Sequence, residues 1–172
     1  MANVFMSMAE ATAKAMHETT IGQQMTLQPW LWPTCETLHF IGLAMLVGAA
    51  GLFDLRLLGF MRRTSLSAVM ELRLWAGLGL AINLVTGLMF FAGAPDQYMH
   101  NPAWWWKVAF ILIAGINILT FEFSPTTKAL VEKIGPNDNT PMRFKVAGGL
   151  SLFSWFAVLY CGRMLPFIGN AF

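Results

Sequence analysis

Four apolar segments, each about as long as a membrane is thick, constrain the fold of this chain more than any other feature. Their approximate bounds are Pro33–Phe53, Leu74–Ala94, Ala103–Phe121 and Lys145–Leu165. A helix needs about 20 residues to cross about 30 Å of hydrocarbon. Only 12% of the 172 residues are charged, whereas soluble domains carry about 25%. The sequence therefore predicts an all-α protein, a four-helix transmembrane up-down bundle with short loops.

The basic residues predict how this bundle lies in the membrane. Eight of the eleven Lys and Arg residues flank the first and third loops: Arg56, Arg62, Arg63, Arg73, Lys128, Lys133, Arg143 and Lys145. Such residues concentrate on the cytoplasmic side. Both termini are therefore expected on the periplasmic side of a bacterial inner membrane. The net charge of +2 is too small to indicate a nucleic-acid partner.

The first 28 residues are predicted to form an amphipathic segment on the outer face, before a transmembrane domain at 29–172. Within 3–18, Val4, Met8, Ala11 and Ala15 share one face of a helix. Such a helix lies on the membrane surface or on a partner subunit. Soft-metal binding is the alternative, and its ligands would be Met6, Met8, Met16 and His17.

His39 is the strongest functional candidate because it lies within the uncharged run Thr37–Phe53. A titratable ring in hydrocarbon needs a hydrogen bond, a proton or a metal. One interpretation is a neutral histidine that donates to a carbonyl oxygen or to Asn83. A second is an axial ligand to haem b, with Asn83 beside the cofactor. The third is a relay for protons or a metal ion.

Cys35, Glu36, His39 and Gly42 follow the spacing that places side chains on one face of a helix. This face is expected to point into the bundle, where the small Gly42 would leave room for a porphyrin edge. Glu36 either favours the positive end of its helix or pairs with Arg163. Arg163 could equally bind a haem propionate. The only two cysteines, Cys35 and Cys161, are expected to be thiols rather than a disulfide.

The stretches Leu31–Gly42 and Phe53–Gly59 resemble a family of small uncharacterised bacterial four-helix membrane proteins with a Trp-Pro…Glu-x-x-His…Asp-x-Arg-x-x-Gly pattern. The resemblance covers about residues 30–165, and it is looser to CopD-type copper-resistance proteins and small b-type cytochromes. It implies this fold and topology, together with haem or redox work. The chain has Phe121-Glu122 where that pattern has Phe-His. The matching positions are Glu36, His39, Asp54, Arg56, Asn117 and Arg163.

Three functions follow from these features. The first is a membrane subunit of a larger complex that holds haem b through His39, or borders a quinone site, and carries electrons between a periplasmic partner and the membrane. The second is a cofactor-free subunit that anchors such a complex. The third is the handling of copper or another small solute. The sequence lacks a phosphate loop and a nucleophile–base constellation, so an independent enzyme is not expected.

Overall fold

The computed structural model describes residues 2–168, and the side chains of 2–6, 8 and 9 are outside that description. The described residues contain helices and no strand, which confirms the all-α class. The long helices are α1 (Ala2–His17), α3 (Leu31–Leu58), α5 (Arg73–Gly93), α7 (Pro102–Glu122) and α9 (Met142–Met164). The short ones are α2 (Thr20–Leu27), α4 (Leu66–Met70), α6 (Pro95–Met99), α8 (Pro125–Val131) and the 3-10 helix η1 (Leu165–Phe167).

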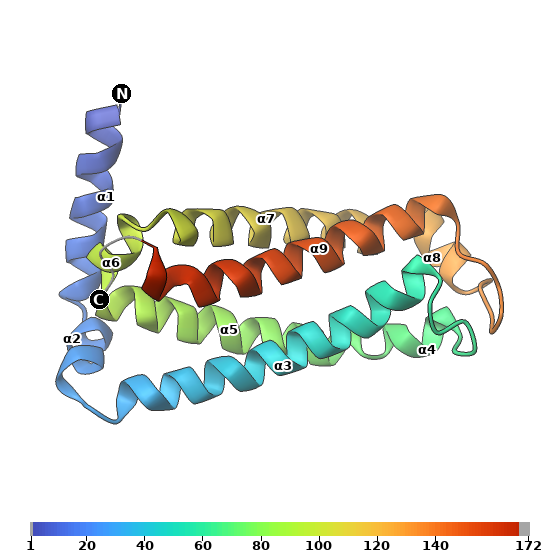
Figure 1. Ribbon diagram of the computed structural model, residues 1–172, viewed down its shortest axis with the longest axis horizontal. Coiled ribbons are helices and arrows are strands. Elements are labelled where there is room, and N and C mark those ends of the chain that lie inside the picture. The colour runs from blue at the N-terminus through green and yellow to red at the C-terminus, as the bar shows by residue number, and fades with distance from the viewer. Residues whose placement is uncertain (1, 169–172) are drawn as a thin grey trace.

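Helices α3, α5, α7 and α9 lie side by side, and successive ones run in opposite directions (Figure 1). Four stretches are long and apolar enough to cross a membrane: Leu31–Leu58, Leu66–Gly93, Pro102–Glu122 and Met142–Phe167. Their outward faces carry large exposed apolar side chains such as Leu88, Ile116 and Phe153, which suit contact with lipid. We call the end of the bundle with α1, α2 and α6 the α2 end, and the opposite end with α4 and α8 the α8 end.

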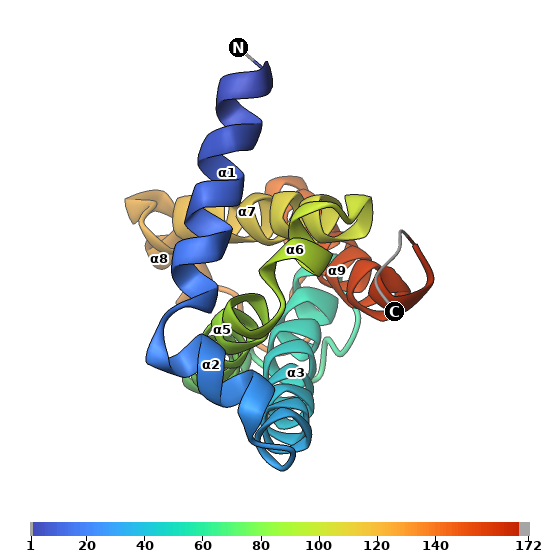
Figure 2. The same cartoon turned by 90° about the vertical axis from the view of Figure 1, so that its left-hand side faces the viewer.

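The amino-terminal segment folds into two helices instead of the single one predicted. The second, α2, begins where the Thr19 hydroxyl accepts a hydrogen bond from the Gly22 N–H, a capping signal that sequence analysis missed. Helix α1 runs across the direction of the long helices (Figures 1 and 2). Its last residue, His17, lies 3.3 Å from the Ala92 carbonyl oxygen through Nδ1. The predicted stripe of Val4 and Met8 falls outside the described side chains.

Prolines mark the starts of both α7 and α9. The Asn101 side chain accepts from the Ala103 N–H, and Pro102 opens α7. At α9 the proline lies one residue before the helix. Pro141 itself is the N-cap, because its ψ of 149° is extended, and α9 begins at Met142.

Helices α3 and α5 make their closest approach at two glycines. A methyl group added at Gly79 would lie 2.6 Å from the Gly42 carbonyl oxygen and 2.6 Å from the Leu46 nitrogen. At this spot the two backbones touch with no side chain between them, as small residues allow in membrane helices. Leu46 also belongs to the central core, with Ala50, Ala114, Trp155 and Val158.

The loops at the α8 end are joined by a fully buried arginine. Arg56 donates to the Thr64, Gly135 and Asp138 carbonyl oxygens at 2.7, 3.1 and 3.5 Å. These carbonyls belong to the two loops that connect α3 with α4 and α8 with α9. Arg56 thereby links the α3–α5 hairpin to the α7–α9 hairpin.

Candidate functional site

Three sulfur atoms meet at the α2 end, between α2, α3 and α5. The Cys35 Sγ lies 3.9 Å from the Met25 Sδ and 3.7 Å from the Met89 Sδ. Cys35 and Met25 are 2% and 3% exposed, whereas Met89 is half-buried, so protein encloses two of the three residues of this sulfur cluster. The prediction that Cys35 lies on the inward face of its helix is confirmed. Met25 could not be predicted as its neighbour, because α2 must fold back over α5 before that side chain can reach Cys35.

His39 lies one helical turn further along the same face of α3, where it contacts α5. Its Nδ1 is 2.7 Å from the Thr86 Oγ1, and Thr86 donates its own hydroxyl hydrogen to the Ile82 carbonyl oxygen at 2.7 Å. The hydroxyl hydrogen is committed, so His39 must be the donor at Nδ1. The Nε2 lone pair is then left open. The prediction that the ring faces the bundle is confirmed, but its partner is Thr86 rather than Asn83 or a carbonyl.

Asn83 and Gly42 serve the contact between α3 and α5. The Asn83 Nδ2 donates to the Gly79 carbonyl oxygen at 2.8 Å, while its Oδ1 is buried without a partner in the described part of the chain. A methyl group added at Gly42 would lie 2.7 Å from that Nδ2 and 3.0 Å from the Gly79 carbonyl oxygen. The expectation that Gly42 leaves room for a porphyrin edge is therefore wrong, since α5 fills this space.

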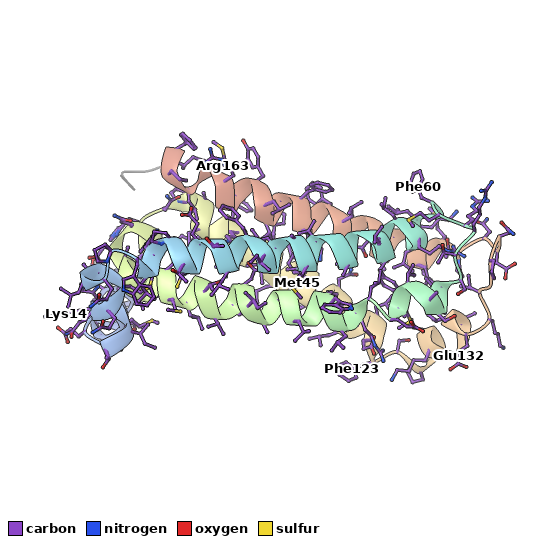
Figure 3. All side chains as sticks on the ribbon, turned by 90° about the horizontal axis from the view of Figure 1, so that it is seen from below. Lys14, Met45, Phe60, Phe123, Glu132 and Arg163 are labelled. Atoms are coloured by element: carbon purple, nitrogen blue, oxygen red, sulfur yellow. The ribbon has the colours of Figure 1, made fainter. Side chains whose placement is uncertain are left out.

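Glu36 and Arg163 do not meet, although both lie near the α2 end. The Arg163 side chain is exposed, its guanidinium carbon is 5.2 Å from the centre of the Phe167 ring, and it points away from the bundle (Figure 3). Glu36 acts on Tyr98 of α6 instead. Burial, with a smaller contribution from Glu36, raises the pKa of Tyr98 to about 12. Glu36 and Arg163 lie at a similar depth along their helices, but depth alone does not determine which way each side chain points.

The two cysteines are free thiols, as expected. Cys161 lies in α9 beside Lys107 of α7. The half-buried Lys107 acts electrostatically on both His39 and Cys161. It forms no ion pair with the described residues, where the ion pairs are Lys14–Glu18 and Arg73–Glu122.

A second polar region lies nearer the α8 end, in a cavity of about 190 Å³ between α3, α5, α7 and α9. Asp54 lines this cavity with Ser151 and Asn117, and the ion pair Arg73–Glu122 also borders it. Asp54 is 2% exposed, and within residues 2–168 its Oδ2 has no hydrogen-bond partner. Asn117 donates to the Ala147 carbonyl oxygen at 3.0 Å and so ties α7 to α9. The walls are otherwise apolar, so this region offers one buried acid and no cluster of ligands.

The donor atoms decide which chemistry the α2 end can perform. Among the described residues, no three His, Cys, Asp or Glu side chains gather as metal ligands. A metal held by these residues therefore needs the thioethers of Met25 and Met89. Thiolate and thioether donors select soft ions such as Cu(I) over Mg²⁺, Ca²⁺ or Mn²⁺.

Comparison with known proteins places the chain in a family. No curated protein and no solved structure matches it, and no relation to CopD-type proteins or cytochromes is shown. A family profile matches residues 19–168, from the cap of α2 to the residue after η1, and leaves α1 outside. Because the match covers most of the chain, the protein belongs to the family of unknown function DUF6644.

Proposed function

We propose that this membrane protein binds a monovalent copper ion at the α2 end, through Cys35, Met25 and Met89. The observation that carries the proposal is the position of the Cys35 Sγ, 3.9 Å and 3.7 Å from two thioether sulfurs. With metal–sulfur bonds of about 2.3 Å, the length found in zinc–thiolate sites, a planar three-coordinate ion separates its sulfurs by about 4 Å. The two separations from the Cys35 Sγ match that geometry.

Charge favours a monovalent ion over a divalent one at this cluster. Binding releases the thiol proton of Cys35, so one thiolate and one Cu(I) form a neutral unit. Zn²⁺ with the same ligands would leave a positive charge in a site whose ligands Cys35 and Met25 are almost fully buried. An uncompensated buried charge is costly. The open Nε2 of His39, one turn away, is a further soft-ion donor on the same face.

The basic residues indicate on which side of the membrane the proposed copper site lies. Arg62, Arg63, Lys128 and Lys133 lie at the α8 end, which the concentration of Lys and Arg assigns to the cytoplasm. The copper site at the α2 end then opens toward the periplasm of a bacterial inner membrane. Helix α1 extends along this outer boundary as an amphipathic anchor, where lipid or other subunits of a membrane complex cover it.

A competition titration tests the proposal. Purified protein in neutral detergent, kept under reducing conditions, is titrated with Cu(I) against a chromophoric Cu(I) chelator. We expect one ion per chain. Cys35→Ser should weaken binding by about 100-fold or more, beyond the 10–100-fold typical for loss of a second-shell group. Met89→Leu removes one thioether at nearly constant volume and should weaken binding by a smaller factor.

Two variants at the same end serve as matched controls. Cys161→Ser removes the other thiol, and Met164→Leu removes a thioether of α9. Both should bind Cu(I) as the wild type does. Equal losses in the control and cluster variants, or wild-type affinity in a Cys35→Ser/Met89→Leu double variant, would refute the proposed site.

A redox subunit that holds haem b is the second candidate, favoured by the open Nε2 of His39. The two residues predicted to assist haem binding are not placed to do so. Helix α5 fills the space beside Gly42, and Arg163 points away from the bundle. An absorption spectrum before and after dithionite reduction distinguishes the two candidates. A Soret band with a sharp alpha band that disappears in His39→Ala would favour haem over copper.

A further inference from the structure

A cationic cradle surrounds Gly59 at the α8 end, where α3 ends and α9 begins. Gly59 caps α3 in the left-handed conformation, with φ of 97°. From the position of a methyl group added there, the Arg62 Nη2 is 3.6 Å away and the Lys145 Cε is 3.7 Å away. The Thr140 Oγ1 is 3.8 Å from the same point. Two hydrogen-bond donors, from Arg62 and Thr140, thus converge on one small space with the end of the Lys145 side chain.

One hydrogen bond of Arg62 holds the cradle in place, and neither cation of the cradle is neutralised by a carboxylate among the described residues. The Arg62 Nε donates to the Gly59 carbonyl oxygen at 3.0 Å, which directs the rest of the guanidinium. Neither Arg62 nor Lys145 forms an ion pair within the described residues. Thr140 is 3% exposed, and its Oγ1 has no hydrogen-bond partner among the residues that the structure describes. A buried hydroxyl without a partner costs free energy, so this one indicates a ligand that accepts its hydrogen bond.

The carboxylate of Asp138, two residues before Thr140, already has a partner. The Asp138 Oδ2 accepts from the Gly135 N–H at 2.9 Å. The first turn of α9 adds the positive end of a 23-residue helix, directly after Thr140. Two cations, a helix amino terminus and an unpaired hydroxyl together suit a phosphate group.

Apolar side chains beside the cradle point to the source of that phosphate. Phe60 and Met61 follow Gly59 and are 62% and 45% exposed, while Met142 and Val146 of α9 are 74% and 60% exposed. Phe60 projects from the end of α3 (Figure 3). A phosphate donor set next to exposed apolar side chains matches the two halves of a phospholipid at the end of a membrane span.

We propose that Arg62, Lys145 and Thr140 bind the phosphate of an anionic phospholipid headgroup, whose acyl chains lie along Phe60, Met142 and Val146. The proposal is independent of the copper site, which lies at the opposite end of the bundle. It predicts one tightly held anionic lipid per chain, in addition to the lipids that surround any membrane protein.

The test uses delipidated full-length protein in neutral detergent with short-chain phosphatidylglycerol, phosphatidylcholine or inorganic phosphate. Native mass spectrometry counts bound lipid, and the thermal unfolding midpoint reports stabilisation. We expect one phosphatidylglycerol per chain and little binding of phosphatidylcholine. Arg62→Gln/Lys145→Gln should weaken the binding about 30-fold, since each basic residue near anionic lipid contributes about 1 kcal/mol and 1.4 kcal/mol is tenfold.

Two variants distinguish a specific lipid site from nonspecific electrostatic attraction between anionic lipid and basic residues. Lys128→Gln/Lys133→Gln removes the same charge at the same end and should bind like the wild type. Thr140→Val should weaken binding while leaving the lipid-free midpoint unchanged or higher, because the hydroxyl it removes has no partner. Equal losses in both double variants would overturn the site. Equal stabilisation by millimolar inorganic phosphate would overturn the lipid assignment.

Discussion

The contact between Gly42 and Gly79 makes a sharp prediction about stability. In Gly79→Ala, the new methyl carbon would lie 2.6 Å from the Gly42 carbonyl oxygen and 2.6 Å from the Leu46 nitrogen. Both are backbone atoms within α3, so neither can rotate away and the two helices must separate. Overpacking of this kind costs about 1–3 kcal/mol, occasionally more.

Gly77→Ala is the matched control, because Gly77 lies two residues earlier on α5 and a methyl group there meets no heavy atom within 4 Å. Helix propensity changes by a similar amount in both variants, so the difference between them isolates the interhelical contact. We expect Gly79→Ala to be less stable than Gly77→Ala by about 1–3 kcal/mol.

Unfolding of both variants in mixed micelles with increasing SDS, followed by helical circular dichroism, measures this difference. Separation of α3 from α5 should also move Met89 away from Cys35, so Gly79→Ala should weaken Cu(I) binding while Gly77→Ala should not. Equal stability of the two variants would refute the backbone contact. Lower stability with unchanged Cu(I) affinity would refute the placement of the sulfur cluster across this interface.

Further predictions address the histidine, the metal, the topology and the tyrosine. Thr86→Val removes the acceptor for the His39 Nδ1–H and should lower unfolding free energy by about 1–3 kcal/mol, measured in the same SDS titration. At pH values below the thiol pKa, Cu(I) affinity should increase about tenfold for each unit by which the pH is raised, because one proton leaves as the ion binds. A pH-independent affinity would exclude thiolate coordination. In a cysteine-free background, Asn137→Cys at the α8 end should resist a membrane-impermeant thiol reagent in intact cells, and labelling without permeabilisation would reverse the proposed orientation. Tyr98 should ionise near pH 12 in a Tyr160→Phe variant; because its folded pKa is raised above about 10, the stability it contributes is complete below pH 10 and is lost as pH rises toward 12. A midpoint near 10 in the ultraviolet titration would contradict its burial.

The sequence predicted the helices well because its signals were local. Long apolar runs place the four spans, and Asn101-Pro102 marks the start of α7. The 3/4 spacing on α3 correctly put Cys35 and His39 on the inward face. Each of these inferences needs only residues that are close together in the chain.

The partners of these side chains were not predictable by the same means. Helical periodicity shows which residues share a face, but not which neighbouring helix that face meets. Gly42 was expected beside a cofactor, and it packs on Gly79 instead. Met25 reaches Cys35 only through the turn after α2. Glu36 acts electrostatically on Tyr98 of α6 instead of pairing with Arg163. Thr86 and Met89 share a face of α5 with Asn83, a stripe that could have been found from spacing alone.

The buried Arg56 has a consequence for how the bundle can open. Its three carbonyl partners, and the bond from the Asn137 N–H to the Arg62 carbonyl oxygen at 2.6 Å, fasten the two hairpins together at the α8 end. Parting them there would strip several buried polar groups of their partners at once. When the two hairpins separate transiently, Arg56 therefore acts as the hinge, and the displacement is largest at the α2 end. Amide hydrogen exchange should accordingly be faster in α2 than around Thr64 and Gly135, and the sulfur cluster lies at the end that can admit an ion.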